Sequence, residues 1–303
     1  FMRALRETGY LDFDEPFAGL MTQGMVCHQT FQDQQGKWLF PTDVERDGDD
    51  WRAIETGEAV TAGRIEKMSK SKRNVIDPEL IISTYGADTA RLFMLSDSPP
   101  ERDMEWTEAG VEGASRFLKR LYRMAGGNDL APVGSPVPTS GAPADLVRAA
   151  HRAIKAISED IEAFRFNKAV AQLYTLANAI ADLQDSSEDS NAARRFGIET
   201  LTRLLAPMAP HVAEEMWQAL GHDTMLAATP WPEADAALVT ESSVEIGVQV
   251  NGKLHDTVSL PRDAAEDEAR AAALASAGVI RYLDGKQPRK IIVVQNRIIN
   301  VVV

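Results

Sequence analysis

Residues 67–78 have the sequence KMSKSKRNVIDP. This short basic stretch is the most distinctive part of the chain, and the elements on either side of it are predicted from local sequence patterns. Lys67 and Lys70 stand three residues apart, with the hydroxyls of Ser69 and Ser71 beside them, so the run can surround an anionic group. Charge that develops on a leaving pyrophosphate can be neutralised by a lysine ammonium, which suits such a run to triphosphate chemistry. It lacks the spaced glycines of a P-loop. Taken alone, a Lys/Ser run is more often an exposed loop.

The residues that follow this stretch predict two helices. Asp77 can cap a first helical turn and Pro78 has the φ angle of a first helical position, so a helix should begin there. It should end near Tyr85, with Gly86 in a left-handed conformation. A second helix should start near Asp88 and stop before a Pro-Pro pair.

A helical bundle is predicted over residues 107–220. Segment 107–124 has an apolar stripe at helical spacing and ends before a Gly-Gly pair. Its opposite face carries basic residues at helical spacing, namely Arg116, Lys119, Arg120 and Arg123. A Gly/Pro/Ser linker at 126–143 precedes periodic apolar residues that predict helices near 144–164, 167–184, 191–205 and 211–220.

The last 60 or so residues change from a helical period to a period of two, which predicts strands. Alternating Val244, Ile246, Val248 and Val250 lead to an Asn-Gly pair, the strongest short-range signal for a hairpin. An Ala-rich helix at 264–277 and a strand pair at 290–294 and 297–303 complete the pattern. The order β-β-α-β-β predicts a small α+β domain.

The first 63 residues are less regular. They contain a short amphipathic helix near residues 2–8, an apolar stretch at 20–26 and a polar segment at 27–63. The polar segment has few apolar residues, so we interpret it as a hairpin or loop excursion, an insertion rather than a core element.

Composition limits the classes of protein that this chain can be. Its 303 residues suggest two or three domains, and 44% hydrophobic residues exclude a disordered chain. A net charge of −13 argues against a strongly basic nucleic-acid binder, but basic segments at 64–73, 116–123 and 281–303 allow local contact with a polyanion. The single cysteine, Cys27, excludes a disulfide framework and indicates a reducing, cytoplasmic setting, with no catalytic role for the thiol. No apolar run is long enough to span a membrane, and no signal peptide is visible.

In its wider context, the stretch 67–78 resembles the second signature of class I aminoacyl-tRNA synthetases. The resemblance continues in residues 85–93 (YGADTARLF), which are typical of the stem-contact region. Residues 205–211 (LAPMAPH), with Glu214, Glu215 and Trp217, are typical of the anticodon-binding domain in the leucine, isoleucine, valine and methionine subgroup. Within that subgroup the chain is most similar to bacterial leucyl-tRNA synthetases, through segments 16–26, 110–118, 248–253 and 282–285.

The resemblance implies a multidomain architecture. Residues 1–76 would be the end of a Rossmann-type α/β catalytic domain with a polar insertion, and residues 77–106 would be stem-contact helices. Residues 107–235 would be an all-α anticodon-binding helical bundle, and residues 242–303 a small α+β C-terminal domain that contacts tRNA.

The resemblance also implies a reaction. ATP and leucine would form leucyl-adenylate with release of pyrophosphate, and the leucyl group would then pass to tRNA-Leu. By motif position, Lys70 would be the catalytic residue that stabilises pyrophosphate, within an ATP-binding loop of Lys67, Met68, Ser69, Lys70 and Ser71. Mg²⁺ would enter with the triphosphate, and no protein-bound metal is expected. Contacts with tRNA would come from Arg116, Lys119, Arg120, Arg123, Lys253, Arg289 and Lys290, although a solvated face is the alternative for each basic segment.

The first signature of the family, a His-x-Gly-His motif, is missing from the sequence. Because Phe1 cannot be a translated start, we expect a C-terminal portion of a longer, monomeric enzyme, inactive alone. The alternatives are a synthetase for isoleucine, valine or methionine, or an RNA-binding module without catalysis. His211 lacks the second histidine of a zinc motif and is interpreted as a helix-start residue, and Trp217 as a core residue.

Overall fold

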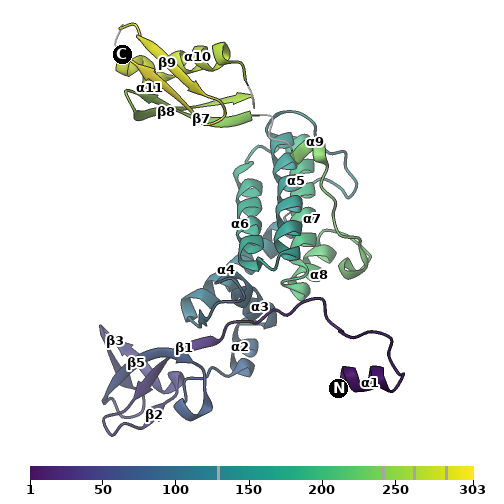
Figure 1. Cartoon of the computed structure of the whole chain (residues 1–303), viewed down its shortest axis with the longest axis vertical. Coiled ribbons are helices and arrows are strands. Elements are labelled where there is room, and N and C mark those ends of the chain that lie inside the picture. The colour runs from purple at the N-terminus through teal and green to yellow at the C-terminus, as the bar shows by residue number, and fades with distance from the viewer. Residues whose placement is uncertain (128–129, 240–242, 262–263, 284–285) are drawn as a thin grey trace. The chain divides into compact units, whose positions relative to one another are not determined.

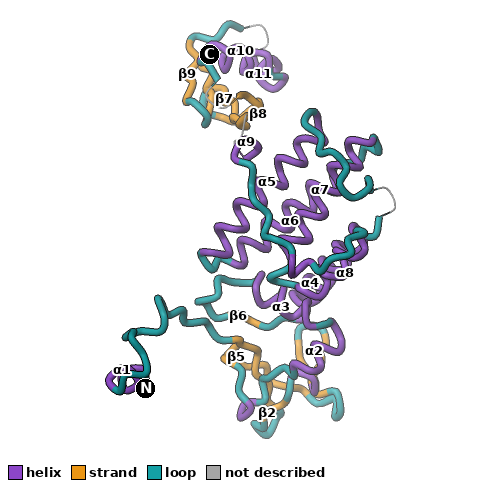
Figure 2. The backbone as a smooth tube through the Cα atoms, turned by 90° about the vertical axis from the view of Figure 1, so that its right-hand side faces the viewer, coloured by secondary structure: helices purple, strands orange, loops and turns teal. Residues whose placement is uncertain are grey.

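The computed structural model describes residues 1–303 except 128–129, 240–242, 262–263 and 284–285. The chain divides into two compact units, Phe1–Ala234 and Asp235–Val303. The first unit contains helix α1 (Met2–Glu7), a β-sheet, two connecting helices and a helical bundle, and the second contains a sheet with helices (Figures 1 and 2).

The sheet of the first unit is built from hairpins. Its strands are β1 (Val26–Gln32), β2 (Trp38–Leu39), β3 (Val44–Asp47), β4 (Asp50–Ala53) and β5 (Ala59–Lys67), in the order β2-β1-β5-β4-β3, with a 3₁₀ turn at Pro41–Asp43. These neighbours are antiparallel, whereas the short strand β6 (Met104–Glu105) pairs with β1 in parallel. The long connection from β1 to β6 includes the hairpins and helices α2 and α3.

The polar segment at 27–63 has a small core of its own. Phe31, Val44 and Val60 are buried together, and Trp51 packs against them with its ring centroid 4.7 Å from that of Phe31. The prediction of hairpins is therefore confirmed. The aromatic side chains of Phe31 and Trp51 give these hairpins a small local core, which is compatible with an insertion.

Two helices connect the sheet to the bundle. Helix α2 (Pro78–Tyr85) begins as predicted, with the Asp77 carboxylate accepting a hydrogen bond from the Glu79 amide. Helix α3 (Ala87–Ser96) follows after Gly86, whose φ of 88° is positive as expected. Its ψ of 152° differs from the predicted left-handed helical conformation, because the same residue also starts α3 and must redirect the chain.

The bundle consists of α4 (Glu108–Ala125), α5 (Gly141–Glu162), α6 (Phe166–Asp182), α7 (Glu188–Leu205) and α8 (Pro210–Ala219), followed by a 3₁₀ turn at Leu226–Ala228. Short connections make α5, α6 and α7 antiparallel neighbours, which lie side by side in Figure 1. Fully buried leucines such as Leu121, Leu173 and Leu204 form the core. Trp217 is 6% exposed, which confirms its place in the core.

Helix α4 packs closely on α3 at a glycine. A Cβ atom on Gly110 would lie 2.4 Å from the Phe93 ring, which is closer than any real contact. The Thr107 hydroxyl caps this helix by accepting from the Gly110 amide. The absence of a side chain at Gly110 therefore lets α3 and α4 pack closely, while the Thr107 cap confirms the predicted start of α4.

The second unit is an α+β fold. After helix α9 (Ala236–Val239), strands β7 (Ser243–Val250), β8 (Lys253–Pro261), β9 (Lys290–Val294) and β10 (Ile298–Val302) form a sheet in the order β8-β7-β10-β9, with helices α10 (Glu266–Ala275) and α11 (Ala277–Leu283) between β8 and β9. The predicted turn has Asn251 at φ 48° and Gly252 at φ 82°, as a type I′ hairpin needs. Two helices replace the single predicted one, because Ser276 has an extended ψ of 139°.

In the parts of the chain that the structure describes, no helix has both the length and the apolar character needed to cross a bilayer.

Candidate functional site

The loop that carries the two predicted lysines leaves the end of a paired strand. Lys67, the last residue of β5, lies opposite Cys27 of β1, and the Met68 amide donates to the Val26 carbonyl at 3.0 Å. Residues Lys70–Lys72 then form a single 3₁₀ turn. The Ser69 hydroxyl caps that turn by accepting a hydrogen bond from the Lys72 amide. The Ser71 hydroxyl oxygen lies 3.3 Å from the Ser69 hydroxyl oxygen. The loop is thus an ordered turn.

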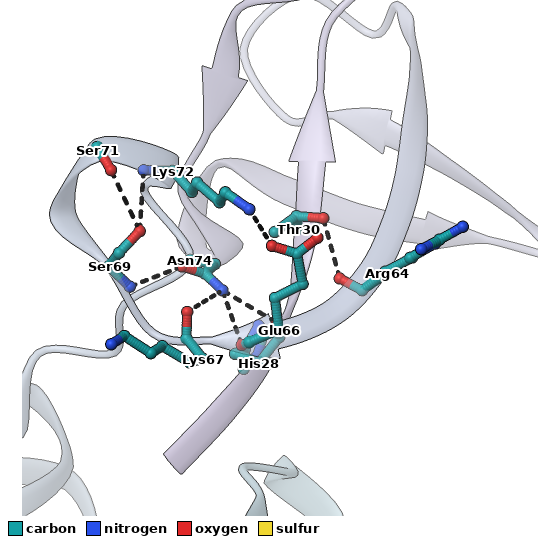
Figure 3. Close-up of polar contacts among 9 residues, drawn as sticks. All are labelled: His28, Thr30, Arg64, Glu66, Lys67, Ser69, Ser71, Lys72 and Asn74. Carbon is teal, nitrogen blue, oxygen red and sulfur yellow. Dashed lines mark hydrogen bonds and ion pairs between the residues drawn. The ribbon is translucent and has the colours of Figure 1, made fainter. Parts of the chain in front are cut away.

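Asn74 lies inside this loop and is fully buried (Figure 3). Its amide nitrogen donates to the carbonyls of His28 and Glu66, both at 3.1 Å, and lies 3.4 Å from the Lys67 carbonyl. Its amide oxygen accepts from the Ser69 backbone N–H at 2.9 Å. One side chain therefore connects β1, the end of β5 and the turn. No local pattern in the sequence distinguishes Asn74 from an exposed turn residue.

Met68 gives the loop an apolar attachment on its other side. Its side chain lines a cavity of about 220 Å³ between the loop, β1 and helices α2 and α3, together with Val26, Ile76, Ile81 and Trp106. An apolar residue between two polar ones thus faces inward, while its neighbours Lys67 and Ser69 are directed to the loop surface and the turn. This arrangement explains why methionine stands between them.

The basic side chains of the loop fall into two groups. Lys72 forms an ion pair with Glu66, as Figure 3 shows, and the Arg73 guanidinium lies 5.0 Å from the Phe40 ring centroid. Lys67 and Lys70 are exposed, and within the described residues neither forms an ion pair. The ammonium group of Lys67 at the end of β5 and that of Lys70 in the 3₁₀ turn are therefore available to an anion from solution.

A second basic region lies at the junction of the connecting helices and the bundle. A cavity of about 970 Å³ is bounded by the α2–α3 turn, α4 and the start of α8. Arg116, Lys119 and Arg123 line it, and all three side chains are exposed. Glu112, which forms an ion pair with Arg116 at 3.3 Å, and the wall residues Asp88 and Glu215 offset part of this positive charge.

The fourth basic residue of that helix points elsewhere. Arg120 donates to the Asn178 side chain at 2.9 Å and to the Ala177 carbonyl at 3.1 Å, both on α6. The four residues share the helical spacing that was predicted, but only three of them line the cavity. Spacing alone does not distinguish them, because Arg120 lies at the edge of the face nearest to α6.

Two polar contacts hold the cavity walls together. Asp88 of α3 is 4% exposed, and its carboxylate accepts from the Val212 amide at 2.6 Å and lies 2.9 Å from His211 Nδ1. Arg91 donates to the carbonyls of Met208 and Pro207. His211 is the second residue of α8, as its interpretation as a helix-start residue requires. The sequence carries no local signal for Asp88 as its partner, since 123 residues separate them.

The basic residues of the second unit lie at one end of its sheet. Lys253 begins β8 and Lys290 begins β9, the two edge strands, and pairing with Val250 and Val302 places both at the same end. Three interstrand spacings put them roughly 14 Å apart. Arg289 stands beside Lys290, and all three side chains are exposed.

Cys27 lies beside the loop but has an unreactive environment. Its side chain is 9% exposed, and burial, with the negative charges of Asp103 and Glu105, raises the pKa of its thiol. A raised pKa lowers the thiolate fraction at neutral pH.

We therefore expect iodoacetamide to modify Cys27 in the folded chain at pH 8 several-fold more slowly than in the same chain unfolded in urea. The rate should rise as pH increases, because the thiolate forms only above the raised pKa. Mass spectrometry of timed samples measures both rates. Equal rates in the folded and unfolded chain would contradict a buried thiol with a raised pKa.

In the described ranges of the chain, no three His, Cys, Asp or Glu side chains gather closely enough to hold a metal ion. The candidate site therefore consists of two regions. One is the loop with its lysines and the buried Asn74 amide, and the other is the basic cavity.

Comparisons with known proteins agree with this geometry. Residues 14–107 match the family described as tRNA synthetases class I (I, L, M and V), and residues 144–270 match the anticodon-binding domain of tRNA ligase. The leucine–tRNA ligases of Rhodospirillum rubrum and Paramagnetospirillum magneticum are each 53% identical to the chain over its whole length. The chain spans about 36% and 35% of the lengths of these two relatives.

A solved structure is similar to the chain as well. The ternary complex LeuRS–tRNA–LeuAMS of Agrobacterium radiobacter K84 aligns with a TM-score of 0.68 and 28% identity, covering 99% of this chain and 35% of that one. Two family matches, and relatives that are identical at about half of all positions, lead to one conclusion. The chain belongs to the leucine–tRNA ligase family of class I tRNA synthetases.

Proposed function

We propose that the chain is the C-terminal portion of a leucine–tRNA ligase, to which it supplies the ATP loop and the tRNA-binding surface. The single observation that carries this proposal is 53% identity to a leucine–tRNA ligase over the whole chain, including the loop with its two exposed lysines. In the reaction, a leucine carboxylate oxygen attacks the α-phosphorus of ATP, and the bond to the bridging oxygen breaks to release pyrophosphate. A ribose hydroxyl of tRNA-Leu then attacks the carbonyl carbon, and AMP leaves.

The ATP loop comprises Lys67, Met68, Ser69, Lys70 and Ser71. Negative charge grows on the β- and γ-phosphates as pyrophosphate leaves, and an ammonium that meets it there lowers the barrier more than it stabilises bound ATP. Lys70 is assigned this role by its position in the motif that the chain shares with the family, and its exposed side chain, with no ion pair among the described residues, supports the assignment. Mg²⁺ enters as part of the ATP complex.

The basic cavity is assigned to the tRNA backbone. Arg116, Lys119 and Arg123 surround a space large enough for a phosphate and its ribose, and they supply charge without a base-reading pattern. In the second unit, Lys253, Arg289 and Lys290 provide a further, more dispersed contact. Such contacts position an RNA and leave its sequence unread.

The finer architecture belongs to the same proposal. Residues 1–76 would be the end of a Rossmann-type domain. The parallel pairing of β1 with β6, which follows helices α2 and α3, supports this assignment, although β6 itself lies beyond residue 76. The stem-contact helices would be residues 77–106, the bundle 107–235 and the last domain 242–303. We propose a cytoplasmic, monomeric enzyme.

The proposal is tested in a hybrid ligase, defined as the Rhodospirillum rubrum leucine–tRNA ligase in which this chain replaces the matching segment. The expected result is leucine-dependent exchange of pyrophosphate into ATP, because the chain would restore the ATP loop. The upstream part of the relative without this segment is the matched control and should give only background exchange. An RNA-binding module without a catalytic role predicts a folded hybrid that is as inactive as the control.

A further inference from the structure

Lys70 is held in place by the backbone of its turn. Its own side chain has no ion pair among the described residues, so the position of its ammonium group depends on that backbone. That turn begins at Ser69, whose N–H donates to Asn74 and whose hydroxyl caps Lys72. The backbone immediately before Lys70 is therefore fixed by one buried amide.

Asn74 uses both ends of its amide. The nitrogen has two N–H groups for the carbonyls of His28 and Glu66, and the oxygen accepts from Ser69. Aspartate would keep the acceptor but lose the two donors, whereas leucine would fill the space and lose both. A buried amide that lacks partners is costly, so this position requires a side chain that can donate and accept at once.

The loop has other attachments that do not involve Asn74. Met68 packs into the apolar cavity, and Lys72 pairs with Glu66. Loss of the Asn74 amide should therefore leave the loop attached to the sheet while Ser69 and Lys70 lose their fixed position.

We propose that Asn74 is a positioning residue for adenylate formation, which acts through the Ser69 backbone to set Lys70 against the leaving pyrophosphate. The proposal rests on the function proposed above. A displacement of about 1 Å at a reacting group can cost about 10²-fold in rate.

The test is a double-mutant cycle in the hybrid ligase, with leucine-dependent pyrophosphate exchange as the readout. Asn74→Ala should lower kcat on the order of 10²-fold. In the Lys70→Ala background the same substitution should cost less than about threefold, because the group that it positions is already gone.

Thr30→Val is the matched control. Thr30 is also buried in β1, and its hydroxyl donates to the Arg64 carbonyl at 3.0 Å, away from the loop (Figure 3). This variant removes one buried hydrogen bond, so it should lower the melting temperature measurably, though less than Asn74→Ala, and leave kcat within about threefold of the parent.

The outcomes separate the two proposals. A parent hybrid without leucine-dependent exchange overturns the proposed function and, with it, the role of Asn74. An active parent in which the effects of Asn74→Ala and Lys70→Ala multiply overturns the positioning role alone. A Thr30→Val variant that loses as much kcat as Asn74→Ala does the same, because the effect would then follow stability.

Discussion

Replacing Lys70 with alanine in the hybrid ligase is expected to lower leucine-dependent pyrophosphate exchange by about 10²–10³-fold. The side chain is exposed and unpaired within the described residues, so its removal leaves the fold of the loop intact. What is lost is an ammonium that meets the charge on the departing pyrophosphate, an interaction made most strongly in the transition state. The loss should therefore appear in kcat, with the Kd for tRNA almost unchanged.

The control for this prediction is Lys37→Ala. Lys37 is an exposed lysine in a hairpin turn of the same sheet, so this variant removes one positive charge without touching the loop. It should keep exchange close to that of the parent. If Lys70→Ala retains most of the exchange activity, or if Lys37→Ala loses as much, the role assigned to Lys70 is wrong.

The second large effect concerns the basic cavity. Replacing Arg116, Lys119 and Arg123 together with alanine should weaken tRNA binding by the hybrid ligase on the order of 10²-fold at low salt. Each phosphate contact that is lost should also flatten the slope of log Kd against log salt concentration by roughly 0.7–0.9. Filter binding across a series of salt concentrations measures both quantities.

The same helix offers a matched control. Arg120 donates to Asn178 and Ala177 of α6 and does not line the cavity, so Arg120→Ala removes one positive charge at a neighbouring position outside the cavity. We expect it to leave the salt slope unchanged and to lower thermal stability modestly. If the triple variant has the same salt slope as the parent, the cavity does not bind tRNA. The same conclusion follows if Arg120→Ala changes the slope as much as the triple variant does.

The helical parts of this fold are predictable because their signals are local. Asp77 and Pro78 indicate the start of α2, Thr107 indicates that of α4, and the Asn-Gly pair gives the β7–β8 turn, since each depends on the chemistry of one or two residues. The core of segment 27–63 was not predictable in the same way. It depends on contact between Phe31 and Trp51, which lie on different strands, and the local sequence does not indicate how those strands pair.

Only part of the site could be predicted from local sequence. The spacing of Lys67 and Lys70 identifies these two residues, but their contacts depend on the fold. The burial of Asn74 was not predictable, because an asparagine after a Lys/Ser run is ordinary for an exposed turn. The different direction of Arg120 and the Asp88–His211 contact depend on how helices pack, which helical spacing within one segment does not report.

We propose that this chain supplies both the ATP loop and the tRNA surface of a leucine–tRNA ligase, and the decisive quantity is the initial rate at which the purified hybrid ligase forms leucyl-tRNA from leucine, ATP and tRNA-Leu. We expect a rate within about tenfold of that of the Rhodospirillum rubrum ligase, because loss of either the ATP loop or the tRNA surface would lower the rate by more than that. A folded hybrid that charges tRNA-Leu no faster than the upstream part alone would contradict the claim.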